Sequence, residues 1–198
     1  MIKNVEIKNK KLNLISTDAH RLGFVATDID TAIDIASAII PRKSIIELFR
    51  LLDEESEEAI NIKFSNSQVV FETKDKQLVT KIIDGKYPEY ERVIPISNDK
   101  LCLINRQDLQ QAVERVGVIG IDKLKSLVII INNNKMNIVC TNEDQEESSD
   151  EIVVNYQYDS PLKFNFNINY VKDLLNNSDH DVLQLAFSES GKSVLITV

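Results

Sequence analysis

The chain has no tryptophan among its 198 residues, and it has only five glycines, four prolines and two cysteines. Such low glycine and proline contents exclude collagen-like and linker-rich proteins. No apolar run approaches the roughly 20 residues that a membrane-spanning helix needs. Because 43% of the residues are apolar, the chain can bury a core as one large or two small domains.

Both cysteines, Cys102 and Cys140, lie in apolar, strand-like runs and have no CxxC or histidine spacing around them. We therefore expect buried, reduced thiols, with no metal site and no cofactor. Met1 is followed by "IKNVEIKNKK", which contains no apolar segment of the kind found in secretory signals. The expected location is cytoplasmic.

The net charge of −8 argues against a protein that coats nucleic acid by bulk attraction, although local basic surfaces remain possible. The acidic residues are concentrated in "DEESEE" (53–58) and "EDQEESSDE" (143–151). Charge runs of this kind are typical of solvated loops, and we expect loops at both places.

An internal repeat organises the chain. "KLNLISTD" (11–18) matches "KMNIVCTN" (135–142), and "INIKFSNS" (60–67) matches "LQLAFSES" (183–190) at nearly the same offset. Between them, "IIELF" (45–49) resembles "YVKDLL" (170–175) as an amphipathic helix. Each copy reads strand, strand, helix, strand, strand, with helix starts at Pro41 and at Asn167 or Asn169. This pattern predicts an α+β fold of two repeated domains, with helices packed on antiparallel sheets.

The two copies differ at their ends. The second opens with a strand and a helix (100–119) that have no counterpart before the first, and the first closes with a strand (77–84) that has none after the second. We expect somewhat less than two whole units, either as a fragment or as domains that borrow elements from a partner. The junction between them (84–95) carries Gly85 and Pro88 but is too apolar for a free linker. It should pack against a domain, most closely beside the turn described next.

The stretch "STDAHRLGF" (16–24) places a Thr, an Asp, a His and an Arg within five positions, at a turn between two strands. One interpretation makes Asp18 and His20 a general acid–base pair, with "SDHD" (178–181) supplying metal ligands for phosphoester hydrolysis. The chain has no glycine-rich phosphate loop, and the second copy has Asn142 and Asp144 in place of Asp18 and His20. The pattern therefore favours a binding site over a reaction centre.

Several motifs, in order, resemble the bacterial DNA polymerase III β subunit, the sliding clamp. They are "TDAHRL", "IIPRKSIIELFRLL", "TKIIDGKYPEYERVIP", "NEDQEESSDEIVV" and "FNFNINYVKDLL". The resemblance implies a DNA-clamp fold and a non-catalytic processivity factor that tethers the polymerase to double-stranded DNA. In that family three similar domains form a subunit, and two subunits close into a homodimer ring. Residues 1–97 would be the middle domain without its opening strand and helix, and residues 98–198 the C-terminal domain without its final strand and tail.

The same resemblance implies a groove for short linear peptides of polymerase and clamp-loader subunits. It would be lined by Thr17, Ala19, His20, Arg21, Leu22, Pro88, Arg92 and Val93. The family usually has glycine where this chain has Ala19, so a positive φ there would strain the turn. The alternative that we keep open is a truncated relative that binds partner peptides without encircling DNA.

The resemblance also indicates two further surfaces. Arg42, Lys43 and Arg50 are the expected DNA-facing residues, since Arg42 and Arg50 share one face of a helix. They would contact phosphates loosely, without reading bases. Solvated helix positions are the alternative for these three. Val118 and Ile119 correspond to subunit-interface positions, and residues of a domain core are the alternative for them.

Overall fold

The structure is a computed structural model that describes residues 2–33, 35–52, 56, 58–119, 126–142, 144–188 and 193–198. The chain forms two compact units, Met1–Tyr90 and Glu91–Val198. Each unit has its own apolar core. No helix in the described residues is long and apolar enough to cross a membrane.

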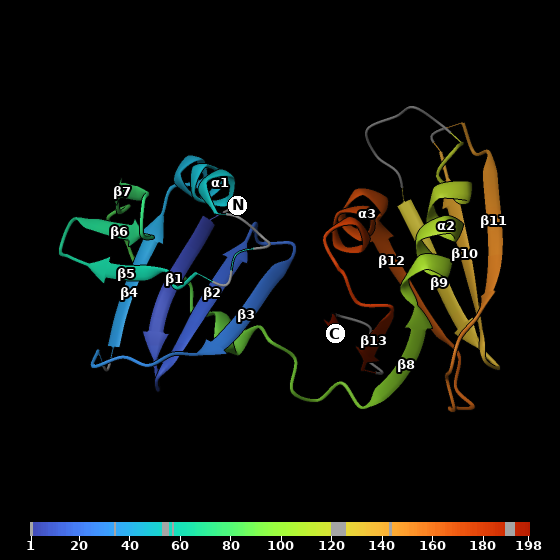
Figure 1. Cartoon of the computed structure of the whole chain (residues 1–198). Helices are drawn as coiled ribbons and strands as arrows, with labels where there is room; N and C mark the ends of the chain where they lie inside the picture. The colour runs from blue at the N-terminus through green and yellow to red at the C-terminus, as the bar shows by residue number, and fades with distance from the viewer. Residues whose placement is uncertain are drawn as a thin grey trace. The chain divides into compact units, whose positions relative to one another are not determined.

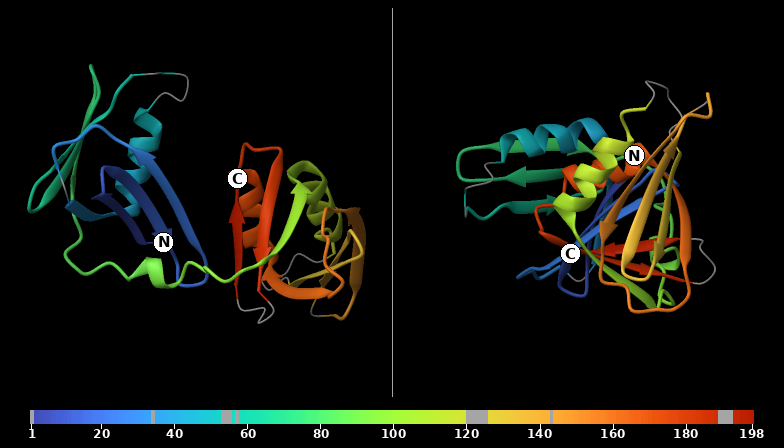
Figure 2. Two further views of the ribbon diagram at one scale, coloured as in Figure 1. Left: turned by 90° about the horizontal axis from the view of Figure 1, so that it is seen from below. Right: turned by 90° about the vertical axis from the view of Figure 1, so that its right-hand side faces the viewer.

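The first unit contains two antiparallel sheets and one α-helix, α1 (Arg42–Leu51). The first sheet has the order β3-β2-β1-β4, built from β1 (Ile2–Lys8), β2 (Lys11–Thr17), β3 (Leu22–Asp28) and β4 (Ile35–Ile40). The second sheet has the order β5-β6-β7, built from β5 (Asn61–Phe64), β6 (Gln68–Glu72) and β7 (Gln77–Lys81). Helix α1 lies over one face of the first sheet, with the second sheet alongside (Figures 1 and 2).

The second unit repeats this plan. Its first sheet has the order β11-β10-β9-β12, built from β9 (Ser126–Asn132), β10 (Lys135–Thr141), β11 (Glu147–Val153) and β12 (Leu162–Asn167). Its second sheet has the order β14-β13-β8, built from β8 (Lys100–Asn105), β13 (Val182–Phe187) and β14 (Val194–Thr197). Two helices, α2 (Arg106–Val116) and α3 (Ile168–Asn176), belong to this unit, and a short 3-10 helix, η1 (Tyr90–Arg92), spans the boundary.

The repeat in the sequence is a repeat of hairpin geometry. Asn9 and Lys10 both have positive φ and join β1 to β2, and Asn133 and Asn134 do the same between β9 and β10. Two-residue hairpin loops of this kind need positive φ at both positions, and asparagine tolerates it better than most residues. The predicted α+β fold with two repeated domains is confirmed by the matching orders of the two four-stranded sheets.

The helices begin where the sequence indicates. The residue before α1 is Pro41, which provides no side-chain cap. The Asn167 side chain accepts a hydrogen bond from the backbone N–H of Asn169 at 2.9 Å, so Asn167 is the cap of α3. Asn105 caps α2 in the same way, through the N–H groups of Gln107 and Asp108.

The two cysteines are buried free thiols, as expected. Burial raises the pKa of the Cys102 thiol to about 12, because a thiolate would lose its hydration there. Cys102 therefore stays protonated and fills core volume as a small apolar group.

The expectation that residues 143–151 form a solvated loop is wrong for most of the run. Residues 147–151 belong to β11, the edge strand of the second unit's sheet. An edge strand can carry charge on its outward side chains, and charge there also discourages pairing with other chains. The other acidic run, 53–58, lies mostly outside the described residues.

Equivalent positions in the two units should respond differently to truncation. Ile138 of β10 is fully buried, whereas Leu14 of β2, its partner in the repeat, is exposed. Ile138→Ala should lower the unfolding free energy of the second unit by about 2–5 kcal/mol, because it leaves a cavity. Leu14→Ala should cost the first unit about 1 kcal/mol or less. Urea unfolding followed by NMR signals from each unit measures both, and equal costs would contradict this description of the two cores.

Candidate functional site

The turn after β2 is held by hydrogen bonds within itself. The Asp18 carboxylate accepts hydrogen bonds from the backbone N–H groups of His20 and Arg21, at 3.2 and 3.0 Å, and from Nε of Arg21 at 3.1 Å. The Thr17 hydroxyl donates to the carbonyl of Arg21 at 2.9 Å and accepts from the N–H of Ala19 at 3.2 Å. Thr17 and Asp18 therefore shape the turn, and their polar atoms are already used.

The electrostatics of Asp18 agree with this structural role. Partial burial acts to raise the pKa of its carboxyl group, but the hydrogen bonds from Arg21 and His20 and the charge of Arg21 outweigh it. The net result is a pKa below the usual value, so Asp18 is an anion at neutral pH. A general acid or base needs a pKa near the working pH, and Asp18 is shifted in the opposite direction.

Ala19 has φ of 72°, in the left-handed region that L-residues with a Cβ avoid. The Thr17 hydroxyl accepts from the N–H of Ala19 itself and the Asp18 carboxylate from the two N–H groups that follow it, and these hydrogen bonds hold the backbone in this conformation. The strain expected from the alanine is therefore present, with a cost of roughly 1 kcal/mol.

The predicted turn residues adjoin an apolar strip on the β2–β3 hairpin. Thr17 pairs with Leu22, and Ile15 pairs with Phe24. Since side chains two residues apart on a strand share a face, Leu22 and Phe24 lie together on the face that also carries Ile15. His20 is exposed, while Arg21 and Leu22 are half-buried. The turn thus presents polar groups beside an apolar surface.

The end of the first unit packs on this same face. The Tyr90 ring stacks on Phe24 with 5.8 Å between ring centroids, and its hydroxyl donates to the Glu6 carboxylate at 2.7 Å. Asn13 also donates to Glu6, at 3.3 Å. Only 8% of Tyr90 is exposed. The expectation that the junction packs against a domain near the turn is therefore met by Tyr90.

Phe24 and Tyr90 were not among the predicted site residues. The sequence signal for Phe24 was its alternation with Leu22 along one strand. The sequence signal for Tyr90 was the apolar character of the junction. Pro88, which was predicted, is exposed, and its carbonyl accepts a hydrogen bond from the N–H of Tyr90 at 2.8 Å. Pro88 is therefore fixed relative to the Tyr90 anchor.

Arg92 and Val93 follow Glu91, the first residue of the second unit, and are both exposed. Arg92 is the last residue of η1, which starts at the anchored Tyr90.

The remaining predicted residues lie elsewhere. Arg42 and Lys43 are exposed at the start of α1, and Arg50 in its last turn forms an ion pair with Glu47 at 3.1 Å. Val118 is 79% exposed, so it is not part of a core, and Ile119 is half-buried.

The residues named in the phosphoesterase interpretation belong to different units, Asp18 and His20 to the first and residues 178–181 to the second. Backbone carbonyls of His180 and Asp181 accept hydrogen bonds from Arg106, which fixes that loop against α2. Within the described ranges, no three His, Cys, Asp or Glu side chains are placed to hold a metal ion.

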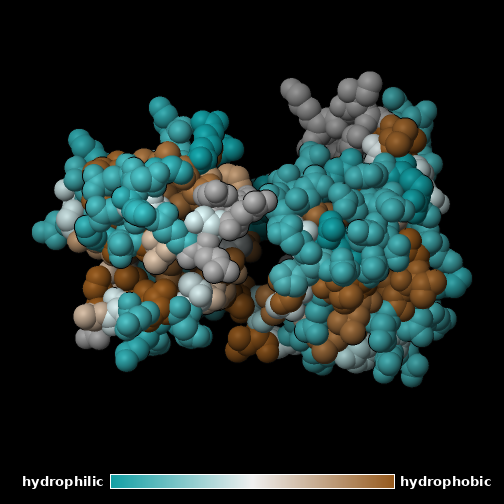
Figure 3. All heavy atoms as spheres, viewed as in Figure 1, coloured by the Kyte–Doolittle hydropathy of each residue, from teal (hydrophilic) through white to brown (hydrophobic). Residues whose placement is uncertain are grey.

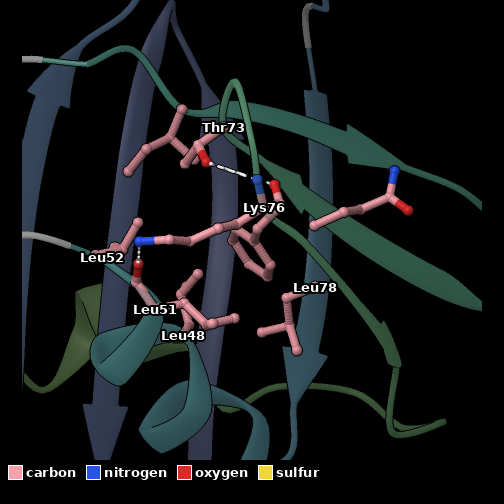
Figure 4. A pocket seen from close by; sticks show the side chains of 9 residues that line it. Leu48, Leu51, Leu52, Thr73, Lys76 and Leu78 are labelled. Atoms are coloured by element: carbon pink, nitrogen blue, oxygen red, sulfur yellow. Dashed lines mark hydrogen bonds between the residues drawn. The ribbon is translucent and has the colours of Figure 1, made fainter.

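A small apolar recess lies at the end of α1, and none of the predicted site residues lines it (Figure 4). Lys76 crosses it and donates from Nζ to the carbonyl of Leu51 at 3.0 Å, while its backbone N–H donates to the Thr73 hydroxyl. Its cavity volume of about 10 Å³ leaves room for about one water molecule. The recess is too small for a ligand site.

Comparisons with known proteins match both units. Residues 3–89 match the family described as "DNA polymerase III beta subunit, central domain", and residues 91–198 match "DNA polymerase III beta subunit, C-terminal domain". The "Beta sliding clamp" of Proteus mirabilis is 30% identical over 96% of this chain, and that of Pseudomonas aeruginosa 32% over 97%. The chain spans about half the length of these curated relatives, 52% in both cases.

Solved structures give the same result. A crystal structure of the DNA polymerase III subunit beta from Pseudomonas aeruginosa superposes with a TM-score of 0.92 and 30% identity, over 98% of this chain and 53% of that one. A sliding clamp from Bartonella birtlesii bound to griselimycin gives a TM-score of 0.89 at 31% identity, over 98% of this chain and 53% of that one.

Replacing the strained alanine should stabilise the turn. Ala19→Gly should raise the unfolding free energy of the first unit by up to about 1 kcal/mol, because glycine adopts positive φ without a steric cost. Ala26→Gly, on the extended strand β3, is the matched control and should be destabilising by about 0.5–1 kcal/mol. Urea unfolding of both variants tests this, and a loss of stability in Ala19→Gly would contradict the φ assigned to Ala19.

The Asp18 carboxylate should make stability depend on pH. Its folded pKa is below the unfolded value of 3.8, so its contribution is present above pH 3.8 and is lost as the pH falls through the folded pKa. Asp18→Asn should therefore cost less than about 1 kcal/mol at pH 7, and the difference from the original chain should shrink under strongly acidic conditions. Unfolding free energies of the two proteins across the acid range measure the effect; a constant difference would rule out this role of the charge.

Proposed function

Because the chain belongs to the DNA polymerase III β subunit family, the sliding clamps, we propose that it tethers a replicative DNA polymerase to duplex DNA without catalysing a reaction. The observation that carries the proposal is the match of both units, in order, to the central and C-terminal domains of that family. Residues 1–97 and 98–198 would then act as the middle and C-terminal clamp domains, in the cytoplasm where bacterial DNA is replicated.

The turn after β2 is proposed as part of a groove for short partner peptides. Leu22 and Phe24 would supply an apolar surface for a leucine or phenylalanine side chain, and Pro88, whose carbonyl accepts from the Tyr90 N–H, would add to it. His20 and Arg21 on the turn can donate hydrogen bonds to a peptide carbonyl or carboxylate. Arg92 and Val93, two and three residues after the Tyr90 anchor, would extend the groove, along with Thr17 and Ala19 in the turn.

The proposal that the chain catalyses no reaction is supported by the charge state of the Asp18 carboxyl group. Asp18 is held as an anion by Arg21 and by two backbone N–H groups, so it is poorly suited to exchange protons with a substrate at neutral pH. A binding turn needs only this fixed shape.

Contact with DNA is proposed at the exposed face of α1. Arg42 and Lys43 are exposed there, and Arg50 is partly neutralised by Glu47. With a net charge of −8, the chain would attract phosphates only locally and weakly, as sliding requires. Val118 and Ile119 are proposed as contacts to a second subunit of a ring.

A second candidate function is favoured by the coverage of about half of each relative. In it, the chain binds partner peptides but does not enclose DNA. Retention on closed circular DNA, with release from the linear form, would support the ring; retention on neither would support peptide binding alone.

We expect a Gln-Leu-x-Leu-Phe type peptide to bind with a Kd in the micromolar range or weaker. Leu22→Ala should weaken binding by roughly tenfold, since it removes apolar contact area, and Arg92→Ala should also weaken it. Fluorescence anisotropy with a labelled peptide measures both effects.

Val25→Ala is the matched control, because Val25 is an exposed residue on the opposite face of the same strand. It should bind the peptide as the original chain does. If all three variants bound equally, the groove would have to be elsewhere.

A further inference from the structure

The segment that follows β7 is attached to the first sheet at both of its ends. We call residues 83–90 the strap; it passes along the sheet before the chain leaves the unit (Figure 2). At its start, Ile83 forms a bridge with Ile39 of β4, and the Ile83 N–H donates to the Ile39 carbonyl at 2.8 Å. At its end, the side chain of Tyr90 is buried against the sheet. Pro88, a residue of the proposed groove, lies between these two attachments.

Tyr90 is held by a polar clasp that consists of Glu6, Asn13 and Tyr90 itself. The Tyr90 hydroxyl donates to Oε2 of Glu6 at 2.7 Å, and Nδ2 of Asn13 donates to the same oxygen at 3.3 Å. The Tyr90 ring stacks on Phe24 with 27° between the ring planes. Because the backbone N–H of Tyr90 donates to the carbonyl of Pro88 at 2.8 Å, the position of Tyr90 constrains that of Pro88.

The carboxylate of the clasp is particular to the first unit. The repeat aligns Asn13 with Asn137. In the strand registers, Asn13 pairs with Glu6, whereas Asn137 pairs with Ile130. Asn13 is only 7% exposed beside Tyr90, while Asn137 is exposed. The fold therefore accepts isoleucine at this position, and the acid occurs in the unit whose sheet carries the strap.

The ring partner of Tyr90 is also particular to the first unit. Phe24 pairs with Ile15, and at the aligned positions of the second unit Ser149 pairs with Val139. Tyr90 leaves 43% of Phe24 exposed. Apolar side chains are visible on the surface of both units (Figure 3), and the open part of Phe24 is a surface on which an apolar peptide side chain can pack.

The clasp selects one position of the strap. Partial burial of the Glu6 carboxylate removes hydration, which costs free energy unless hydrogen bonds replace it. The Tyr90 hydroxyl provides one of these bonds only when the ring lies in one place. Contact between apolar surfaces tolerates sliding, whereas a hydrogen bond from a hydroxyl group to a charged oxygen is directional.

We propose that Glu6 is a positioning residue for the peptide groove. It acts through Tyr90, by holding the strap and its Pro88 in the position in which the groove is complete. This role rests on the proposed function of the turn after β2. Without the clasp, the strap would keep its attachment at Ile83 but would occupy the binding position for only part of the time. Peptide affinity would then fall in proportion to the fraction of molecules that can bind.

The test uses Tyr90→Phe and Glu6→Ile, made singly and together in the full chain. The probe is a labelled Gln-Leu-x-Leu-Phe type peptide, and fluorescence anisotropy gives its Kd. The double variant should bind about fivefold more weakly than the original chain. Each single variant should lose about as much, because both changes break the same hydrogen bond. Glu6→Gln keeps an acceptor for the phenol and should recover most of the affinity that Glu6→Ile loses.

Ser37→Ala is the matched control. Ser37 is a cross-strand neighbour of Glu6, and its hydroxyl donates to Oδ1 of Asn4 at 3.0 Å, so the change removes a hydrogen bond of the same face that does not involve Tyr90. This variant should bind the peptide as the original chain does. Urea unfolding gives the stability of every variant. An affinity loss that followed the loss of stability throughout, Ser37→Ala included, would make the role of Glu6 purely structural and overturn the proposal.

Hydrogen exchange tests the clasp without the peptide. The Tyr90 N–H should exchange about tenfold faster in the double variant, because the strap around it is released. Unchanged exchange would overturn the clasp whatever the peptide does. No binding by the original chain, or equal binding by Leu22→Ala, would instead overturn the proposed groove. If the original chain binds and the double variant binds equally well, or if Glu6→Gln binds as weakly as Glu6→Ile, the groove stands and the positioning role of Glu6 is wrong.

Discussion

A sheet with apolar side chains on both faces needs cover on both, and this constraint determines where the candidate site lies. In the first unit, α1 covers part of one face over Val5, and Tyr90 covers part of the other over Phe24. The turn that carries His20 and Arg21 is at the end of the hairpin under Tyr90. The candidate site thus depends on how the second face is closed: Tyr90 packs on Phe24 of β3, and the Pro88 carbonyl is hydrogen-bonded to the N–H of Tyr90.

The contact of Tyr90 combines apolar burial with one strong polar interaction. Its ring buries area against Phe24, and its hydroxyl reaches Glu6, which Asn13 also contacts. A phenol donating to a carboxylate is a charge-assisted hydrogen bond, stronger and more directional than a neutral one. Apolar packing alone would allow the junction to slide along the face, whereas this bond gives it one position.

Much of the fold could be predicted from the sequence, since the two copies carry the same alternation, turns and helix starts. The repeat of 11–18 at 135–142 identified β2 and β10, and Asn167 was one of two candidate caps. The edge strand β11 was missed because its charged residues, such as Asp150, obscure the alternation of a strand that is covered on one side only. Tyr90 was missed as an anchor because its partner Glu6 is 84 residues away, and nothing local in either segment signals that bond.

The two repeats also show why only one of them carries the candidate groove. After β10, Asn142 replaces Asp18, and its side chain accepts from the N–H of Glu146 at 2.9 Å and donates to the Glu146 carboxylate. An amide gives this turn an acceptor, as Asp18 does, but it has no charge to hold an arginine. The sequence of the second turn contains neither histidine nor arginine, with Asp144 in place of His20, and the strand after it begins with Glu147 instead of Leu22. A turn of related construction is therefore present in both units, and only the copy after β2 carries the exposed His20 and the half-buried Leu22 on which the proposal of a peptide groove rests.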